Sequence, residues 1–501
     1  MADVDRPHPP GDYPLVVVGS GPGALQTSYC LTKLGVRHAV ISQDDSPGGM
    51  FRRFPVFQRL ISWSKPYAPV AKNDPGYEWF DWNSLQAEEP ENRNLVPTFM
   101  DGSSYFPARS EMEQGLVAFA EGTGLSIRYG CTWESTERTG EGFVLNTSDG
   151  DYGCRVVIFA IGTTAPWKAH VPGIDRVPHY AEVTAPRDYA GKRVFIIGKR
   201  NSGFELADGL LPWASRIVLA SPRPARLSVV TRSLVGARAR YAQPYEDAVL
   251  GGGNLIVDAS IERIERTGEN FLVHARATGA GKDLVFEADE VIAATGFETP
   301  LRDLRALGVA TLMQDRVPAQ TPHWESVSVP GIYFAGSATQ GATELQRNGV
   351  PSSSAAVQGF RYNAQILARH VAREHFGVEV DRPRLSSDDV IEHLLTRATC
   401  SGALWNQKGY LASLVTFDDD GGATDEGIVP LSHYVDSSGP DAVAVAIESD
   451  PGSDIHPTVF VRRHGRVDEH VLEGHPLNEY RSPDHRIQLG SVLGGLASRA
   501  S

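Results

Sequence analysis

The chain has little cysteine: four residues among 501, with no two of them close together in the sequence. An enzyme that relays electrons through a dithiol needs two neighbouring thiols, as in a Cys-x-x-Cys pair. The sequence therefore predicts against that class of enzyme. We expect the four side chains to behave as small buried hydrophobes. They are Cys30, Cys131, Cys154 and Cys400.

Long apolar runs and an excess of positive charge are also missing. No apolar run approaches the roughly 20 residues that span a bilayer, and Met1 to Tyr13 contains no apolar signal core. Acidic residues outnumber basic ones by 61 to 47, which gives a net charge of -14. This charge disfavours nucleic acid and anionic membranes as partners. We expect a cytoplasmic protein that binds small molecules and no metal, with self-association left open.

What the chain does have is two glycine turns, each between an apolar strand and a helix. The first turn, residues 19–24, follows the strand at 15–18. A dinucleotide pyrophosphate binds backbone amides at a helix N-terminus, where glycine permits a sharp turn and close approach. We expect FAD at this turn, although a tight turn without nucleotide is the alternative. The residues expected to hold FAD are Gly19, Gly21, Gly23, Ala24, Ser42, Gly49, Met50, Gly336 and Ser354.

Two of these assignments depend on position relative to predicted elements. The acidic residue that usually contacts the ribose should end the second strand, but that register holds Ser42, with Asp44 and Asp45 just beyond. Ser354 begins a predicted helix at 354–375, whose N-terminal amides would stabilise the negative charge of a reduced flavin. Simple N-capping by serine is the other interpretation, and both can hold together.

The second glycine turn, residues 198–203, departs from the usual pattern. Gly198 and Gly203 fit it, but Arg200 replaces the middle glycine. Its side chain either contacts a phosphate or fills the site. The next strand ends without a carboxylate and is followed by arginines, which favours the 2′-phosphate of NADPH unless these arginines are merely solvated. The residues expected to hold NADPH are Gly198, Arg200, Asn201, Ser202, Ser221, Arg223 and Thr295.

The order of the segments predicts an α/β fold with two Rossmann-like dinucleotide-binding domains and a small strand-containing C-terminal region. A buried strand and glycine turn at 331–336 return to the first sheet, so the NADPH domain is inserted into a split FAD domain. The expected boundaries are 12–165 for the first part of the FAD domain, 166–320 for the NADPH domain, 321–380 for the second part of the FAD domain, and 381–501 for the C-terminal α+β region.

Several motifs occur together in a characteristic order. They are Gly19-x-Gly21-x-x-Ala24, Gly48-Gly49, residues 60–62, Lys65, 81–85, 106–109, 201–205, 294–297 and 359–362. In these motifs the chain is similar to the flavin-containing monooxygenase superfamily, which includes Baeyer–Villiger enzymes and the ornithine and lysine N-hydroxylases. It also resembles FAD-dependent oxidoreductase domain-containing proteins and their bacterial relatives.

The resemblance implies that NADPH reduces FAD, that O2 adds at flavin C4a, and that the adduct oxygenates a small amine or amino acid. Some relatives of this kind oxidise free amino acids in bacterial secondary metabolism, including aspartate to nitrosuccinate. In the family an asparagine near the flavin holds the oxygen adduct. Asn83 is the candidate here, with Lys65 as a second catalytic candidate, and a turn residue is the alternative for Asn83.

A polar amino acid needs positive partners for its carboxylates. We expect the segments that contain Arg232 and Arg238 near the cleft, and the substrate candidates are Arg240, Arg347 and Arg361. The alternative for each is an ordinary surface or structural arginine. Two other functions stay open: a flavin oxidase or reductase without a stable oxygen adduct, and a non-catalytic flavin-bound scaffold. The interval from Gly173 to His179 is longer than the glycine–histidine spacing of the monooxygenases, and with Arg200 it keeps the scaffold alternative open.

Overall fold

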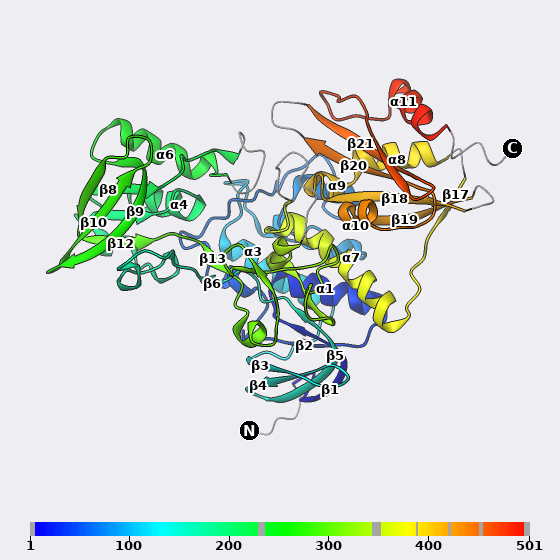
Figure 1. Ribbon diagram of the computed structural model, residues 1–501, viewed down its shortest axis with the longest axis horizontal. Coiled ribbons are helices and arrows are strands. Elements are labelled where there is room, and N and C mark those ends of the chain that lie inside the picture. The colour runs from blue at the N-terminus through cyan, green and yellow to red at the C-terminus, as the bar shows by residue number, and fades with distance from the viewer. Residues whose placement is uncertain are drawn as a thin grey trace.

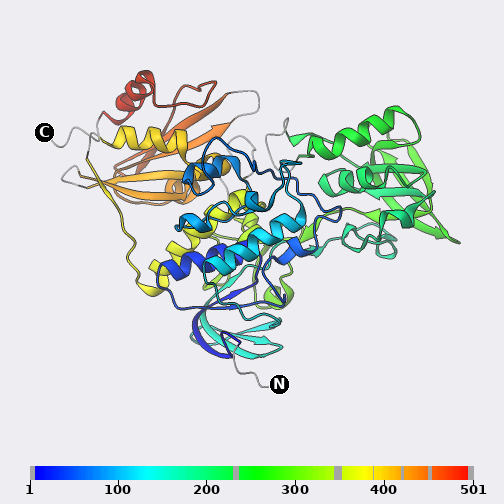
Figure 2. The same ribbon diagram turned by 180° about the vertical axis from the view of Figure 1, so that it is seen from behind.

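The computed structural model describes residues 6–228, 236–342, 352–386, 389–418, 422–449 and 454–494. Within these residues three six-stranded sheets organise the chain. Figures 1 and 2 show the second sheet as a separate lobe on one side of the first, and the third sheet as a lobe at the C-terminal end. No helix in the described part of the chain has the length and apolar character needed to cross a bilayer.

The first sheet has the strand order β2-β1-β5-β4-β3, with β16 paired to β5. The carboxyl-terminal ends of its parallel strands β1 and β5, and all of β2 and β16, are buried apolar runs, as expected when helices cover both faces. Val17 lies opposite Val40 on one side and Ile158 on the other. The strands are β1 (Gly11–Val18), β2 (Ala39–Ile41), β3 (Trp133–Arg138), β4 (Phe143–Thr147), β5 (Gly150–Phe159) and β16 (Ile332–Phe334).

Helices from both ends of this region cover the first sheet. In Figure 2 the blue helix α1 and the yellow helix α7 lie side by side. Strand β16 runs parallel to β5, so the chain returns to this sheet after the second sheet is complete. The helices are α1 (Pro22–Lys33), α2 (Val96–Phe99), α3 (Arg109–Gly122) and α7 (Val357–Phe376).

The second sheet has the order β11-β10-β9-β8-β7-β12, in which β9, β8, β7 and β12 are parallel. It has its own apolar clusters around Phe204 and Phe195. Its strands are β7 (Arg193–Ile197), β8 (Arg216–Ser221), β9 (Leu255–Thr267), β10 (Asn270–Ala277), β11 (Asp283–Ala288) and β12 (Glu290–Ala293), and its helices are α4 (Asn201–Leu210) and α6 (Ala239–Leu250).

The third sheet is antiparallel, with the order β17-β19-β18-β20-β21-β22. Its strands are β17 (Arg384–Leu385), β18 (Leu411–Phe417), β19 (Ala423–Pro430), β20 (Ala442–Ser449), β21 (Ile455–Arg463) and β22 (Arg466–Val471). Its helices are α8 (Asp389–Cys400), α9 (Gly402–Asn406), α10 (Leu431–Asp436) and α11 (Pro483–Leu493).

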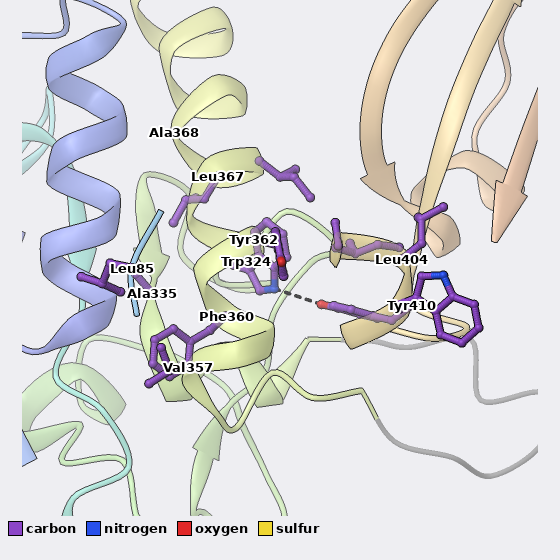
Figure 3. Close-up of a cluster of buried hydrophobic side chains, with 14 of the residues drawn as sticks. Leu85, Trp324, Ala335, Val357, Phe360, Tyr362, Leu367, Ala368, Leu404 and Tyr410 are labelled. Atoms are coloured by element: carbon purple, nitrogen blue, oxygen red, sulfur yellow. Dashed lines mark hydrogen bonds between the residues drawn. The ribbon is translucent and has the colours of Figure 1, made fainter. Parts of the chain in front are cut away.

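This C-terminal lobe shares one apolar core with the first sheet. The core runs from Leu25 in α1 through Leu367 in α7 to Val445 in β20. Figure 3 shows the junction, where the buried indole of Trp324 donates a hydrogen bond of 3.0 Å to the Tyr410 hydroxyl. Because burial of apolar surface is the main stabilising contribution, the lobe is integral to the first domain.

Short elements complete the described chain. They are the strands β6 (Ala165–Pro166), β13 (Phe297–Glu298), β14 (Thr311–Leu312) and β15 (Val317–Pro318), and the 3-10 helices η1 (Gly49–Arg52), η2 (Pro75–Phe80), η3 (Pro90–Asn92), η4 (Ile174–Arg176), η5 (Tyr180–Glu182), η6 (Pro186–Tyr189), η7 (Arg302–Arg305) and η8 (Gly336–Gly341). The predicted α/β fold class with two Rossmann-like sheets is confirmed. The residue limits of the domains stay predictions.

Candidate functional site

A cavity of about 460 Å³ opens at the carboxyl ends of the parallel strands of the first sheet. This is where open α/β sheets bind their ligands. Its walls come from the turn after β1, from η1, from the segment after β5, from the first turn of α7 and from Arg238 at the start of α6. The cavity therefore joins the first glycine turn to the second domain.

Glycines bring three backbone segments together at this cavity. A Cβ atom on Gly23 would lie 2.4 Å from Gly336 Cα, and one on Gly49 would lie 2.9 Å from Gly21 Cα. Gly19 has φ +126°, and a Cβ there would lie 2.5 Å from the Ala160 carbonyl oxygen. No side chain caps α1, whose N-cap is Gly21. The amides of its first turn thus face the cavity in the arrangement that binds pyrophosphate.

The ribose corner of the first turn is built from a chain of hydroxyl groups. Ser42 is buried and its Oγ donates to Ser20 Oγ at 2.8 Å. Ser20 Oγ donates in turn to Asp44 Oδ2 at 2.9 Å. Ser42 lines the cavity, but Asp44 also lines it and carries the carboxylate that a ribose hydroxyl requires. The signal in the sequence was the acidic pair just beyond the predicted register.

Most residues predicted to hold FAD line the cavity, and two do not. Ala24 is fully buried within α1. Ser354 is fully buried, and its Oγ accepts hydrogen bonds from Asn363 Nδ2 at 3.0 Å and Gln407 Nε2 at 3.1 Å. Helix α7 begins at Val357 rather than at Ser354, so 355–358 take the cavity wall. The residues that line it as predicted are Gly19, Gly21, Gly23, Ser42, Gly49, Met50 and Gly336.

At the second turn, glycines again allow close packing. Gly198 has φ +131°, and a Cβ there would lie 2.3 Å from the Ala294 carbonyl oxygen. A Cβ on Gly203 would lie 2.2 Å from the Gly198 carbonyl oxygen. Arg200 is the N-cap residue of α4, and its side chain is exposed. The side chain is therefore open to solvent at the N-terminus of α4.

A second arginine lies near Arg200. The guanidinium of Arg316 stacks on Trp167 at 4.6 Å and donates to the Phe297 carbonyl oxygen at 2.8 Å. Burial lowers the pKa of Arg316, and the positive charge of Arg200 lowers it further. Two like charges beside a helix N-terminus favour an anion there.

The other residues predicted at the second site hold its loops together. Asn201 Oδ1 accepts from the Arg238 amide at 2.9 Å, and Thr295 Oγ1 donates to the Trp167 carbonyl oxygen. Ser221 Oγ donates to the Arg223 carbonyl oxygen at 3.4 Å, and the Arg223 side chain is exposed. Ser202 lies partly buried in the first turn of α4.

Of the catalytic candidates, Asn83 lies one layer behind the cavity. It is fully buried; its Oδ1 accepts from Ser62 Oγ and its Nδ2 donates to Ser64 Oγ at 2.9 Å. Ser62, and not Asn83, is among the cavity-lining residues. Lys65 is exposed, with Nζ 5.6 Å from the ring centroid of Trp63. Asn83 is connected to the cavity wall through its hydrogen bond with Ser62.

The structure describes two of the three substrate candidates, and it corrects the assignment of Arg361. Arg361 is fully buried, and its Nη1 donates to the carbonyl oxygens of Asp81 at 3.1 Å and Ser84 at 2.9 Å. It is therefore an internal anchor of the first domain. Arg240 lies over the Phe106 ring at 4.9 Å and does not appear among the cavity-lining residues. Arg347, like Arg232, lies outside the described residues.

Three other arginines line the cavity, and one of them, Arg302 in η7, donates to the Trp133 carbonyl oxygen. Arg53 and Arg238 approach the cavity from η1 and α6 respectively. Burial lowers the pKa of Arg238, and its Nε has no hydrogen-bond partner among the described residues. The sequence placed Arg238 near the cleft without marking it as a candidate. Arg53 carried no sequence signal, since its approach depends on the fold of η1.

The interval from Gly173 to His179 packs the second domain. His179 is fully buried and its Nε2 lies 2.8 Å from the Gly296 carbonyl oxygen. A Cβ on Gly173 would lie 2.0 Å from the Ile264 carbonyl oxygen. Neither residue appears among those that line the cavity.

Comparisons with known proteins agree with this architecture. Residues 16–336 match the family described as pyridine nucleotide-disulphide oxidoreductase. FAD-dependent oxidoreductase domain-containing protein 2 of Mus musculus is 24% identical over 457 residues, which cover 84% of this chain and 66%, just under two thirds, of that protein. All four cysteines lie within the described residues and are free.

Two solved structures share the fold. The flavin-containing monooxygenase from Stenotrophomonas maltophilia has a TM-score of 0.54 at 21% identity, covering 72% of this chain and 98% of its own. The ornithine N-hydroxylase of Kutzneria sp. 744 has a TM-score of 0.54 at 14% identity, covering 72% and 99%. At these identities the likeness shows the fold alone.

Proposed function

Because the chain belongs to the pyridine nucleotide-disulphide oxidoreductase family, we propose that it is an FAD- and NADPH-dependent monooxygenase that N-oxygenates a small amine or amino acid, in bacterial secondary metabolism. One observation carries the proposal. A single cavity extends from the first glycine turn to Arg238, whose amide is bonded to Asn201 at the second turn. Two dinucleotides held in this way would meet across it, as hydride transfer requires.

The residues at the first turn fit FAD. The uncapped amides of α1 would bind the pyrophosphate, and Asp44 would accept from the ribose. Gly21 and Gly49 lie so close together that a Cβ atom on Gly49 would be 2.9 Å from Gly21 Cα. Because neither residue has a side chain, their backbone is open to a bound pyrophosphate. The first turn of α7 lines the same cavity and would help to hold the flavin. When bound and reduced by NADPH, FAD supplies the oxygen-activating chemistry.

The residues around the cavity support a substrate that carries a carboxylate. Among the described residues, no group accepts a hydrogen bond from Nε of the partly buried Arg238, and burial lowers the pKa of its guanidinium. Arg53 lines the same cavity. A carboxylate forms strong charge-assisted hydrogen bonds with guanidinium groups. Ser62, oriented by Asn83, offers a hydroxyl in the same wall.

The proposal is tested by following both electrons and oxygen. NADPH is expected to reduce the purified flavoprotein without O2. With air and a productive amine, oxygen consumed is expected to appear in an N-oxygenated product, measured by mass spectrometry with 18O2. Pairs such as ornithine and putrescine, or aspartate and β-alanine, compare substrates with and without the extra carboxylate. In each pair, we expect the substrate with the additional carboxylate to have a KM about tenfold lower than that of the other substrate.

A second function, an NADPH oxidase, is favoured by one observation: Asn83 is withdrawn from the cavity wall. That function predicts one H2O2 per NADPH with every amine in the panel. Failure of NADPH to reduce the flavin at all would contradict both functions and leave a flavin-bound scaffold.

Arg200→Gly tests the unusual second turn. Arg200 and Arg316 together would hold the NADPH pyrophosphate, each charge-assisted bond contributing about 1.5–3 kcal/mol. The variant is therefore expected to bind NADPH about tenfold more weakly, as read from the dependence of flavin reduction rate on NADPH concentration. Arg187→Gly, at an exposed arginine of the same domain, serves as the control. A gain in affinity would mean that Arg200 obstructs the site.

A further inference from the structure

A carboxylate lies at the ribose corner of the second site, although the sequence after β8 contains none there. Strand β9 is parallel to β8, and Asp258 is in register with Ser221, the last residue of β8. In a dinucleotide-binding sheet, the adenosine ribose lies at the end of this strand. Asp258 comes from the neighbouring strand, so its position becomes visible only in the folded sheet. Its side chain is 45% exposed.

The buried side chain of Lys199 neutralises the negative charge of this carboxylate. Lys199 follows Gly198 in the glycine turn, and its side chain is only 1% exposed. Its Nζ donates to the Val257 carbonyl oxygen at 2.9 Å and forms an ion pair with Asp258 Oδ1. A buried ammonium group requires an acidic partner of this kind to offset the loss of its hydration. The pair therefore places no net charge at the corner, while Arg223 and Arg226 follow on the exposed side.

We propose that the Lys199–Asp258 pair determines the preference of the second site for a 2′-phosphorylated nucleotide. Lys199 holds Asp258 and cancels its charge, so the corner accepts the 2′-phosphate next to the arginines that follow Ser221. A free carboxylate at this corner would repel that phosphate and accept hydrogen bonds from the 2′-hydroxyl of NADH instead. The inference rests on the proposed function, because it concerns the same nucleotide site.

Binding of nucleotide fragments to the full-length flavoprotein tests the inference without catalysis. The probes are 2′,5′-ADP and 5′-AMP, measured by calorimetry. The parent protein is expected to bind 2′,5′-ADP more tightly. Lys199→Met is expected to weaken binding of 2′,5′-ADP by about tenfold or more, and to bind 5′-AMP at least as tightly as the parent does. Adding Asp258→Asn to Lys199→Met is expected to restore most of the loss.

Lys192→Met is the matched control. Lys192 pairs with Glu290 at 2.7 Å in the same domain, at the amino end of the parallel strands. This variant loses a lysine from an ion pair far from the nucleotide corner. Both fragments are expected to bind it as they bind the parent.

Each possible outcome of these binding measurements either supports or contradicts the inference. If Lys199→Met keeps the parent preference, the inference is wrong while the nucleotide site stands. If the parent binds neither fragment, or binds both equally, the NADPH site and the inference fail together. If Lys199→Met does not fold, Asp258→Asn alone decides. Retained preference for 2′,5′-ADP with unchanged 5′-AMP affinity supports the inference, and weakened 5′-AMP shows that Asp258 itself binds the ribose and overturns it.

Discussion

Gly21→Val is expected to give a folded protein that purifies without flavin. Gly21 lines the cavity at the N-terminus of α1, with extended backbone at φ -75° and ψ 176° that valine also adopts. Among the described residues, a Cβ there would have only Gly49 Cα within 4 Å, at 3.8 Å, which is ordinary van der Waals contact. The branched methyl groups would occupy the space that the pyrophosphate needs. Flavin occupancy, read from absorbance per mole of protein, is expected to fall to below about a tenth of the parent value.

Gly140→Val controls for the substitution itself. A Cβ on Gly140 meets nothing within 4 Å, and this glycine does not line the cavity. The variant is expected to retain flavin and to have the same Tm as the parent protein. Full flavin occupancy in Gly21→Val would show that FAD does not bind at the first turn.

Arg361→Leu is expected to destabilise the protein strongly and to leave substrate affinity unchanged in the fraction that folds. The buried guanidinium holds the carbonyl oxygens of Asp81 and Ser84, and its Nη2 donates to the Tyr362 hydroxyl at 3.2 Å. Glu78 accepts from that hydroxyl and would lose its nearby positive charge. Removing one partner from a buried charged network costs about 3–5 kcal/mol in the free energy of unfolding.

Arg373→Leu, on the same helix α7, is the matched control. Arg373 is 51% exposed and pairs with Glu374 at the surface, so its loss is expected to cost no more than about 0.5 kcal/mol. Urea unfolding followed by tryptophan fluorescence measures both variants. A stable Arg361→Leu protein with a raised KM for amino acids would return Arg361 to the substrate site.

The sequence predicts the glycine turns and the fold class well, because strand, turn and helix signals are local. Gly19, Gly21 and Gly49 are recognisable from neighbours that lie within a few positions. The roles of Asn83 and Arg361 cannot be recognised in this way. The sequence around a buried asparagine or arginine that binds carbonyl oxygens does not differ from the sequence around one at the surface or in a binding site. The position of Asp258 could not be predicted for another reason. Asp258 lies beside Ser221 because of the register between two parallel strands, and no local sequence pattern encodes that register.

The split first sheet has a consequence for how the protein is made. The cavity needs both the turn at Gly21 and the wall formed by Gly336 and the start of α7. A ribosome delivers these parts in order, with the whole second sheet between them. The second sheet has apolar clusters of its own and can fold while synthesis continues, whereas the first must wait. Binding of FAD at this cavity, as proposed, would therefore follow the synthesis of α7.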